Sequence, residues 1–160
     1  MFLKTDIWNV QDTQFPVIGT LEEKLKFVLN YAILAPSSHN TQPWLFKIDS
    51  GVIYFYADRS RILPIADPDG RELIISCGAA LFNLRIALHH FGYAGKIKTF
   101  PDSTDPDLLA TIELGDPIQE ATDEKLLFQA IQKRHTNRHD YQDWDVPETL
   151  LKSLQKDAIS

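Results

Sequence analysis

The segment from Asp69 to Phe91 constrains the fold more than any other part of the sequence. Its apolar residues recur at the three- and four-residue spacing of a helix that buries one face. These residues are Leu73, Cys77, Leu81, Leu84, Leu88 and Phe91. Asp69 and Glu72 have the spacing of a capping box at its start, and Gly92 ends it. At about 1.5 Å per residue the predicted helix is roughly 30 Å long, so the other elements must pack around it.

Shorter periodic segments precede and follow this helix. They are the predicted helices 21–34 and 123–134, a last helix from Pro147, and the strands 44–48, 52–56, 96–100 and 108–114. The turn at 49–51 is short enough to join the first two strands as a hairpin. Antiparallel hairpins beside one long helix predict an α+β fold with an antiparallel or mixed sheet and a long central helix.

Length and charge narrow the class of protein. A chain of 160 residues is about one domain, and it buries roughly 70% of the surface that its unfolded form exposes. Sixteen basic against twenty-two acidic residues give a net charge of −6, which argues against a nucleic acid or an anionic membrane as partner. No uninterrupted apolar run approaches the ~18 residues of a membrane span, and the N-terminus lacks the pattern of a secretory signal. The sequence therefore predicts a cytoplasmic protein.

Common catalytic and metal-binding patterns are missing from the sequence. There is no Gly-rich dinucleotide fingerprint, phosphate loop, nucleophile elbow or zinc-protease helix. Cys77 is the single cysteine and lies on an apolar helix stripe, which favours an inert buried thiol. His135 and His139 are four residues apart, but no third ligand accompanies them, so no metal is expected. The sequence assigns no catalytic side chain.

The segment 36–44, Pro-Ser-Ser-His-Asn-Thr-Gln-Pro-Trp, packs two serine hydroxyls and two amides between prolines and runs into a predicted strand. One interpretation is an ordinary turn between a helix and a strand. The other is a polar cradle for a flat heterocycle such as a flavin ring, because Asn and Gln amides offer donors and acceptors in one plane. Prolines at either end would hold such a loop in place before the ligand arrives.

The segment 133–139 gathers cations in an otherwise acidic chain. If the chain is extended here, Arg134, Thr136 and Arg138 point the same way, and two guanidiniums with a hydroxyl form a phosphate clamp. The alternative is a basic helix C-terminus favoured by the helix dipole, which explains Lys133 and Arg134 but leaves the other two without a role. Both arginines are expected to be exposed, so replacing them should change the fold little.

Together the two segments resemble the flavin-binding nitroreductase family. Residues 36–44 match its Pro-Ser-Ser-x-Asn-x-Gln-Pro-Trp motif, and residues 134–138 resemble its Arg-x-Ser/Thr-x-Arg/Lys phosphate motif. Tyr141 falls where the family often has an aromatic residue. The residues that the resemblance implies for the FMN ring are Ser37, Ser38, Asn40 and Gln42, and those for its phosphate are Arg134, Thr136 and Arg138.

The resemblance also implies an activity and an assembly. The family forms a homodimer of nitroreductase-like α+β subunits with FMN at the interface. A nicotinamide, NADH or NADPH, delivers hydride to the flavin, which then passes electrons to a small-molecule nitroaromatic or quinone in a ping-pong cycle. Such chemistry needs few catalytic side chains, because the cofactor carries it. The small residues of the central helix also favour close approach by a second helix, a second subunit or a flat ligand; they are Ser76, Gly78, Ala79 and Ala80.

Further segments closely resemble the Acg-type branch, in which two nitroreductase-like repeats are fused in one chain. The runs that carry this resemblance are Asp58–Arg61, Leu63–Pro64, Asp67–Leu73 and Ser76–Leu81. In ordinary members the phosphate motif precedes the Pro-Ser-Ser loop, whereas here it follows. The resemblance therefore implies a first repeat over residues 1–120 and, over 121–160, an incomplete start of the second. A complete FMN site would be built across two copies, or would not exist.

Three functions are left open by these observations. The first is an FMN-dependent NAD(P)H oxidoreductase of the nitroreductase type. The second is a protein that binds or sequesters flavin without catalysis, and the third is a truncated nitroreductase-like interaction module. Bound FMN that a nicotinamide reduces would indicate the first, bound FMN that it leaves oxidised the second, and no FMN binding the third.

Overall fold

The computed structural model describes residues 9–140 and 142–159, and it confirms the α+β class. Its elements, in chain order and with η marking short 3-10 helices, are η2 Asp12–Gln14, α1 Leu21–Ala32, η3 Ser38–Asn40, β1 Trp44–Asp49, β2 Val52–Ala57, η4 Arg59–Arg61, α2 Arg71–His90, β3 Tyr93–Thr99, β4 Leu108–Pro117, α3 Thr122–Lys133 and α4 Glu148–Ile159. Each predicted helix and strand is present, with boundaries shifted by at most a few residues.

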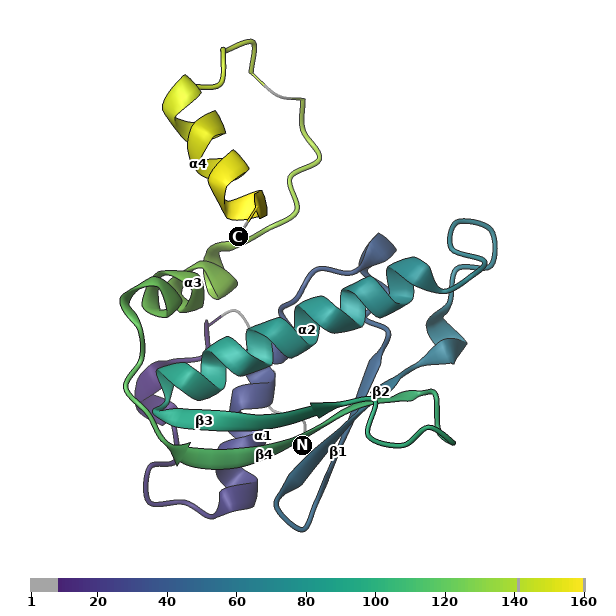
Figure 1. Cartoon of the computed structure of the whole chain (residues 1–160), viewed down its shortest axis with the longest axis vertical. Coiled ribbons are helices and arrows are strands. Elements are labelled where there is room, and N and C mark those ends of the chain that lie inside the picture. The colour runs from purple at the N-terminus through teal and green to yellow at the C-terminus, as the bar shows by residue number, and fades with distance from the viewer. Residues whose placement is uncertain (1–8, 141, 160) are drawn as a thin grey trace.

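The four strands form one sheet in the order β1-β2-β4-β3, with α2 lying across it (Figure 1). Every neighbouring pair is antiparallel, so the sheet is not mixed. β1 and β2 form the predicted hairpin. Its turn residues Ser50 and Gly51 have φ values of 51° and 80°, the left-handed pair that a type I′ turn requires.

The hydrophobic core lies where α2 packs against the sheet and against α1 and α3. Ile53, Phe55 and Ala57 are buried and alternate with half-exposed neighbours along β2, so one face of this strand belongs to the core. Leu84 and Leu88 of α2 are fully buried in the same cluster. Each such side chain stabilises the fold by about 1.5–3 kcal/mol through its burial.

Because α2 is a core helix, its apolar composition has a structural explanation. Among the described residues it is the one helix long and apolar enough, by its mean hydropathy of 1.3, to cross a membrane. Asn83 and Arg85 interrupt its apolar sequence, which is why no continuous apolar run marks it. Nearly half of the most apolar 18-residue stretch of α2 is buried inside the domain.

The start of α2 differs from the prediction. The capping box of Asp69 and Glu72 is wrong, because the residue before the helix is Gly70, in the left-handed region with φ 69°. The cap is Asp67, whose two carboxylate oxygens accept the backbone N–H groups of Glu72 and Leu73 at 3.0 and 2.9 Å. Gly70 turns the chain so that a carboxylate three residues before it reaches the unpaired N–H groups of the first helical turn.

The second pair of strands is longer than predicted, since β3 begins three residues earlier and β4 ends three residues later. Two glycines permit this. A Cβ at Gly95 would lie 3.0 Å from Leu88 Cδ1, and a Cβ at Gly115 would lie 2.5 Å from the carbonyl oxygen of Ala94. Glycine weakens a strand pattern in the sequence, yet here Gly115 allows the close approach of the neighbouring strand's backbone and Gly95 leaves room for the Leu88 side chain of α2.

α3 docks on the C-terminal end of α2. The ring of Phe128 stacks on the ring of His90 with 3.6 Å between centroids, and Ile131 is also buried. A second contact joins His89 Nδ1 to Glu124 Oε1 at 2.8 Å. The end of α3 is therefore fixed relative to the core, and this places the residues that follow Lys133.

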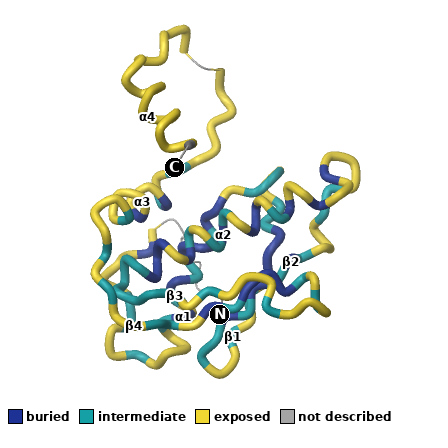
Figure 2. Tube along the Cα trace, in the orientation of Figure 1, coloured by how far each residue is buried: buried dark blue, intermediate teal, exposed yellow. Residues whose placement is uncertain are grey.

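Beyond α3 the chain leaves the body of the molecule (Figure 1). Every described side chain from 135 to 158 is exposed (Figure 2). On α4 this includes three leucines, Leu150, Leu151 and Leu154, which are 49%, 45% and 55% exposed. The predicted boundary between the first repeat, residues 1–120, and the start of the second, 121–160, remains a prediction. In the structure α3 packs on α2, and the exposed segment begins after α3.

Candidate functional site

Two segments about a hundred residues apart in the sequence line one cavity of about 290 Å³. Its lining residues are Ala35, Pro36, Ser37, Asn40, Arg134, His135, Thr136 and Arg138. The first four follow α1 and the last four follow α3. Because α1 and α3 both pack on α2, the segments that leave their C-terminal ends meet here. Five of the seven residues predicted to bind cofactor line this cavity: Ser37, Asn40, Arg134, Thr136 and Arg138.

Arg134 joins the two segments. Its Nη2 donates to the carbonyl oxygen of Leu34 at 3.2 Å, and its Nη1 lies 3.5 Å from Thr136 Oγ1. Its Nε is buried and has no hydrogen-bond partner among the described residues. Arg138 is exposed as expected, but Arg134 is only half exposed, because its guanidinium reaches back to the end of α1. The expectation that both arginines are exposed is therefore wrong for Arg134.

The chemistry of the cavity favours an anion. Its lining carries the guanidinium groups of Arg134 and Arg138 and no Asp or Glu side chain. Ser37, Thr136 and Asn40 add two hydroxyls and an amide. Arginine forks matched with hydroxyl groups are typical of sites that bind phosphate or carboxylate.

The two remaining predicted residues lie outside this cavity. Ser38 lines a neighbouring hollow of about 290 Å³, together with Glu72, Ile75, Ser76 and Ala79, and its Oγ donates to Glu72 Oε2 at 3.3 Å. The two hollows share Pro36 and Ser37. The side chain of Gln42 instead turns to the scaffold, where Nε2 lies 3.4 Å from the carbonyl oxygen of Ile33. Gln42 therefore supports the loop.

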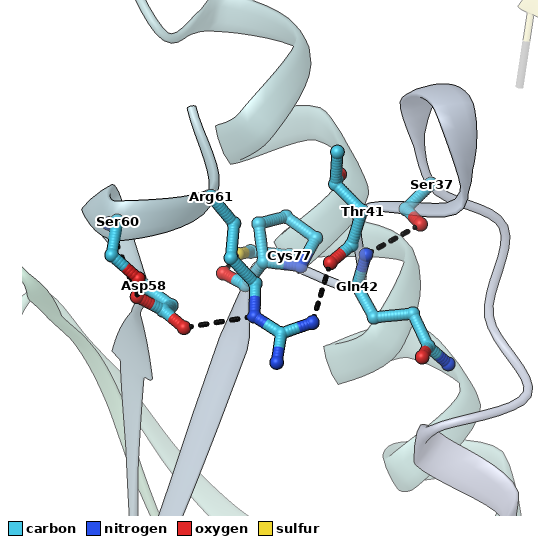
Figure 3. Close-up of polar contacts among 8 residues, drawn as sticks. Ser37, Thr41, Gln42, Asp58, Ser60, Arg61 and Cys77 are labelled. Carbon is cyan, nitrogen blue, oxygen red and sulfur yellow. Dashed lines mark hydrogen bonds and ion pairs between the residues drawn. The ribbon is translucent and has the colours of Figure 1, made fainter. Parts of the chain in front are cut away.

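The loop that carries Ser37 and Asn40 is hydrogen-bonded to the segment after β2, as Figure 3 shows for Arg61, and to α2 through Cys77. Arg61 Nη1 donates to the carbonyl oxygen of Thr41 at 2.9 Å, and Cys77 Sγ donates to that of Pro43 at 3.2 Å. Burial raises the pKa of Cys77 to about 12, so its thiol stays protonated and can donate. The sequence placed Arg61 in an Acg-type run but gave no signal of this contact.

The partner of Arg61 is Asp58, whose Oδ2 accepts from Arg61 Nε at 3.0 Å. The hydrogen bond from the Ser60 hydroxyl, with a smaller contribution from the Arg61 guanidinium, lowers the pKa of Asp58. Asp58 is therefore ionised throughout the neutral range. Among residues 9–140 and 142–159, the structure holds no group of three His, Cys, Asp or Glu residues suited to a metal ion. Tyr141 lies outside the described residues.

The structure is an α+β domain with a cavity whose lining favours an anion, and comparisons with known proteins identify its family. No model of a protein family matches the chain. A Mycobacterium tuberculosis protein named "Putative NAD(P)H nitroreductase Rv3131" is 40% identical over 136 residues, which cover 85% of the chain and 38% of that protein. "Putative NAD(P)H nitroreductase acg" of the same organism is 32% identical over 132 residues, 81% of the chain and 40% of that protein.

A third relative is "Probable NAD(P)H nitroreductase PigM" of a Serratia species, 39% identical over 79 residues, 48% of the chain and 22% of that protein. The chain belongs to the nitroreductase family, on its Acg-type branch, which confirms the resemblance found in the sequence. The chain spans about two fifths of the length of the two mycobacterial relatives.

Proposed function

We propose that the protein is an FMN-dependent NAD(P)H oxidoreductase that reduces nitroaromatics or quinones by ping-pong hydride transfer. The observation that carries the proposal is the cavity in which the Pro-Ser-Ser loop and the arginine segment meet. The names of the relatives support an NAD(P)H-linked nitroreductase in general. The nicotinamide donor also suits the cytoplasmic location expected from the sequence.

The residues present fit the phosphate end of FMN. Arg134 and Arg138 supply two positive charges, Thr136 supplies a hydroxyl, and no carboxylate lines the cavity to repel an anion. The buried Nε of Arg134 is a donor that lacks a partner among the described residues, and such a group is costly unless a ligand satisfies it. At about 290 Å³ the cavity is near the lower limit of ligand pockets, which suits part of a cofactor rather than all of it.

The ring end would lie against the neighbouring hollow, which begins at the shared residues Pro36 and Ser37. Ser37 and Asn40 offer a hydroxyl and an amide to polar ring atoms, while Ile75 and Ala79 offer an apolar wall. When bound, FMN supplies the capacity to accept hydride from a nicotinamide and to pass electrons to a second substrate. The protein binds and orients it, and no side chain is assigned a catalytic step.

We propose that the protein acts as a homodimer. On the exposed side of α2, Ile75 and Phe82 are 54% and 43% exposed, and a Cβ at Gly78 would meet no atom within 4 Å. With the exposed leucines of α4, this is apolar surface that a second copy would cover. Light scattering tests the proposal, and a strict monomer in the presence of FMN contradicts it.

The absorbance spectrum of the purified protein tests the function directly. We expect a yellow protein, or one that becomes yellow with added FMN, whose flavin band is bleached by NADH or NADPH and restored by a nitroaromatic. Bound FMN that a nicotinamide leaves oxidised would indicate a flavin-sequestering protein. A colourless protein with no thermal shift in FMN would refute both and indicate an interaction module.

A further inference from the structure

The loop after α1 contains an unusual run of left-handed residues. His39, Asn40 and Gln42 have φ values of 50°, 57° and 48°. Positive φ is uncommon for residues other than glycine, and it persists only where surrounding contacts fix it. Three such residues in a span of four therefore need support from outside the loop.

One peptide unit in this loop is held at both of its polar ends. Arg61 Nη1 donates to the carbonyl oxygen of Thr41 at 2.9 Å, and the N–H of the next residue, Gln42, donates to Ser37 Oγ at 2.9 Å. Figure 3 shows both bonds on the Thr41–Gln42 peptide. The unit ends at left-handed Gln42, and only Thr41 separates it from left-handed Asn40.

Arg61 is itself held in place. Asp58 Oδ2 accepts from Arg61 Nε at 3.0 Å, and the N–H of Ser60 donates to Asp58 Oδ1 at 3.1 Å. The backbone N–H of Asp58 also donates to the carbonyl oxygen of Pro43 at 3.0 Å, so the segment 58–61 forms two hydrogen bonds to the loop. The Arg61 side chain is 52% exposed. Its partner Asp58 is 14% exposed, and an ion pair with one member half in solvent contributes little to global stability, so its main effect is local.

We propose that Arg61 is a positioning residue of the cofactor site. By fixing the Thr41–Gln42 peptide it fixes the N–H that the Ser37 hydroxyl accepts. A hydroxyl has one proton to donate, and because Ser37 accepts this bond, its own proton remains for a ligand in the cavity that it lines. Arg61 thus sets the orientation of Ser37 without touching the ligand. The identity of the ligand as FMN rests on the proposed function, whereas the restraint of the loop does not.

A double-mutant cycle tests the coupling between Arg61 and Ser37. We expect Arg61→Ala and Ser37→Ala each to weaken FMN affinity by about tenfold, as loss of one hydrogen bond would. The double variant should be little worse than either single one, because both remove the same donor geometry. FMN affinity is measured by quenching of flavin fluorescence. Fully additive losses, or an Arg61→Ala variant that binds FMN as the wild type does, would overturn the proposal.

The matched control is Arg59→Ala. Arg59 lies in the same 3-10 helix, and its Nε pairs with Asp107 Oδ1 at 2.8 Å. Its side chain is 43% exposed, close to the value for Arg61, but among the described residues it forms no hydrogen bond to the loop. We expect Arg59→Ala and Arg61→Ala to have equal melting temperatures and only the second to lose FMN affinity. A melting temperature that falls in Arg61→Ala in proportion to the affinity would show a merely structural role.

Amide hydrogen exchange tests the restraint without FMN. In the ligand-free protein the Gln42 N–H should exchange about tenfold faster in Arg61→Ala and at the wild-type rate in Arg59→Ala. Unchanged exchange in Arg61→Ala would refute the restraint. If the wild type binds no FMN, the proposed function fails, and this measurement still decides the role of Arg61. Should Arg61→Ala not fold, Arg61→Lys replaces it with the same expected direction, because a single ammonium group lacks the fork by which the guanidinium bonds Asp58 and Thr41 through separate nitrogens.

Discussion

The two halves of the cavity are held by the protein in different ways. The loop 36–43 is bonded to the segment after β2 and to α2, through Arg61 and Cys77. The arginine segment is bonded to the body by Arg134, which donates to the Leu34 carbonyl, while Thr136 and Arg138 are exposed. One half has its binding geometry built into the scaffold, and the other depends on how α3 docks.

This difference separates two ways of binding a ligand. A loop already fixed in its binding conformation loses little conformational freedom when the ligand arrives. Exposed arginine side chains lose more rotamer freedom, and they compensate through charge-assisted hydrogen bonds. Substitutions in the loop should therefore act through geometry, and substitutions in the arginine segment through charge and through the docking of α3.

The largest effect is expected from undocking α3. Phe128 is 4% exposed and its ring contacts those of His90, Tyr31 and Phe91. Phe128→Ala should lower the free energy of unfolding by about 3–5 kcal/mol, because it removes a buried aromatic ring and leaves a cavity. FMN binding should be lost with it, since Arg134 follows this helix. Urea denaturation measures the first effect and flavin fluorescence the second.

The control for Phe128→Ala lies two residues away. Leu126 is 63% exposed on the same helix, so Leu126→Ala should change the free energy of unfolding by no more than about 0.5 kcal/mol. Equal losses in the two variants would mean that α3 is held by its helical propensity rather than by docking. The contrast between the two halves of the cavity would then be false.

Sequence periodicity predicted the α-helices and β-strands of the described residues, but none of the 3-10 helices. Apart from α4, whose leucines are exposed, each of these elements buries one face and so repeats its apolar residues at a fixed spacing. Periodicity failed to predict the cap of α2 and the ends of β3 and β4, because backbone geometry rather than burial determines them. Asp67 caps α2 only because Gly70 adopts the left-handed conformation. The second pair of strands is longer than predicted because Gly115 lets the neighbouring backbone approach closely and Gly95 leaves room for the Leu88 side chain. These features depend on conformations that the residue pattern does not encode.

The site follows the same division. Five side chains that line the cavity were predicted from the short motifs, since a ligand requires particular chemical groups at particular positions. The sequence does not assign Arg61 and Cys77 to the site, because they contact only backbone carbonyl groups of the loop. Every residue has a backbone carbonyl, so such a contact produces no residue pattern. The partial burial of Arg134 was missed for the same reason, because its partner is the backbone carbonyl of Leu34.

Intermediate effects are expected from replacing the two arginines of the cavity one at a time. Arg134→Ala should weaken FMN affinity by about tenfold or more and lower the free energy of unfolding by about 1–3 kcal/mol, because it leaves the Leu34 carbonyl without its partner. Arg138→Ala should weaken affinity to a similar extent with unchanged stability, since Arg138 is exposed. Parallel FMN titrations and urea denaturation measure both quantities. Equal free energies of unfolding in the two variants would show that the bond from Arg134 to the Leu34 carbonyl is unimportant. Lys133→Ala is the control for the loss of one positive charge.

The smallest effect at neutral pH concerns Cys77, on the side of the cavity that the scaffold fixes. Burial raises the pKa of this thiol from 9.0 to about 12, so the folded state favours the protonated form that donates to Pro43. Its contribution to stability is therefore fully present below about pH 9 and is lost as the pH rises from there toward 12. The difference in unfolding free energy between wild type and Cys77→Ala should be constant from about pH 6 to 8 and shrink above pH 9. A difference that already changes between pH 6 and 8, or alkylation of the folded protein by iodoacetamide at pH 8, would mean that the thiol is accessible and that this side of the loop is held less firmly than the arginine segment.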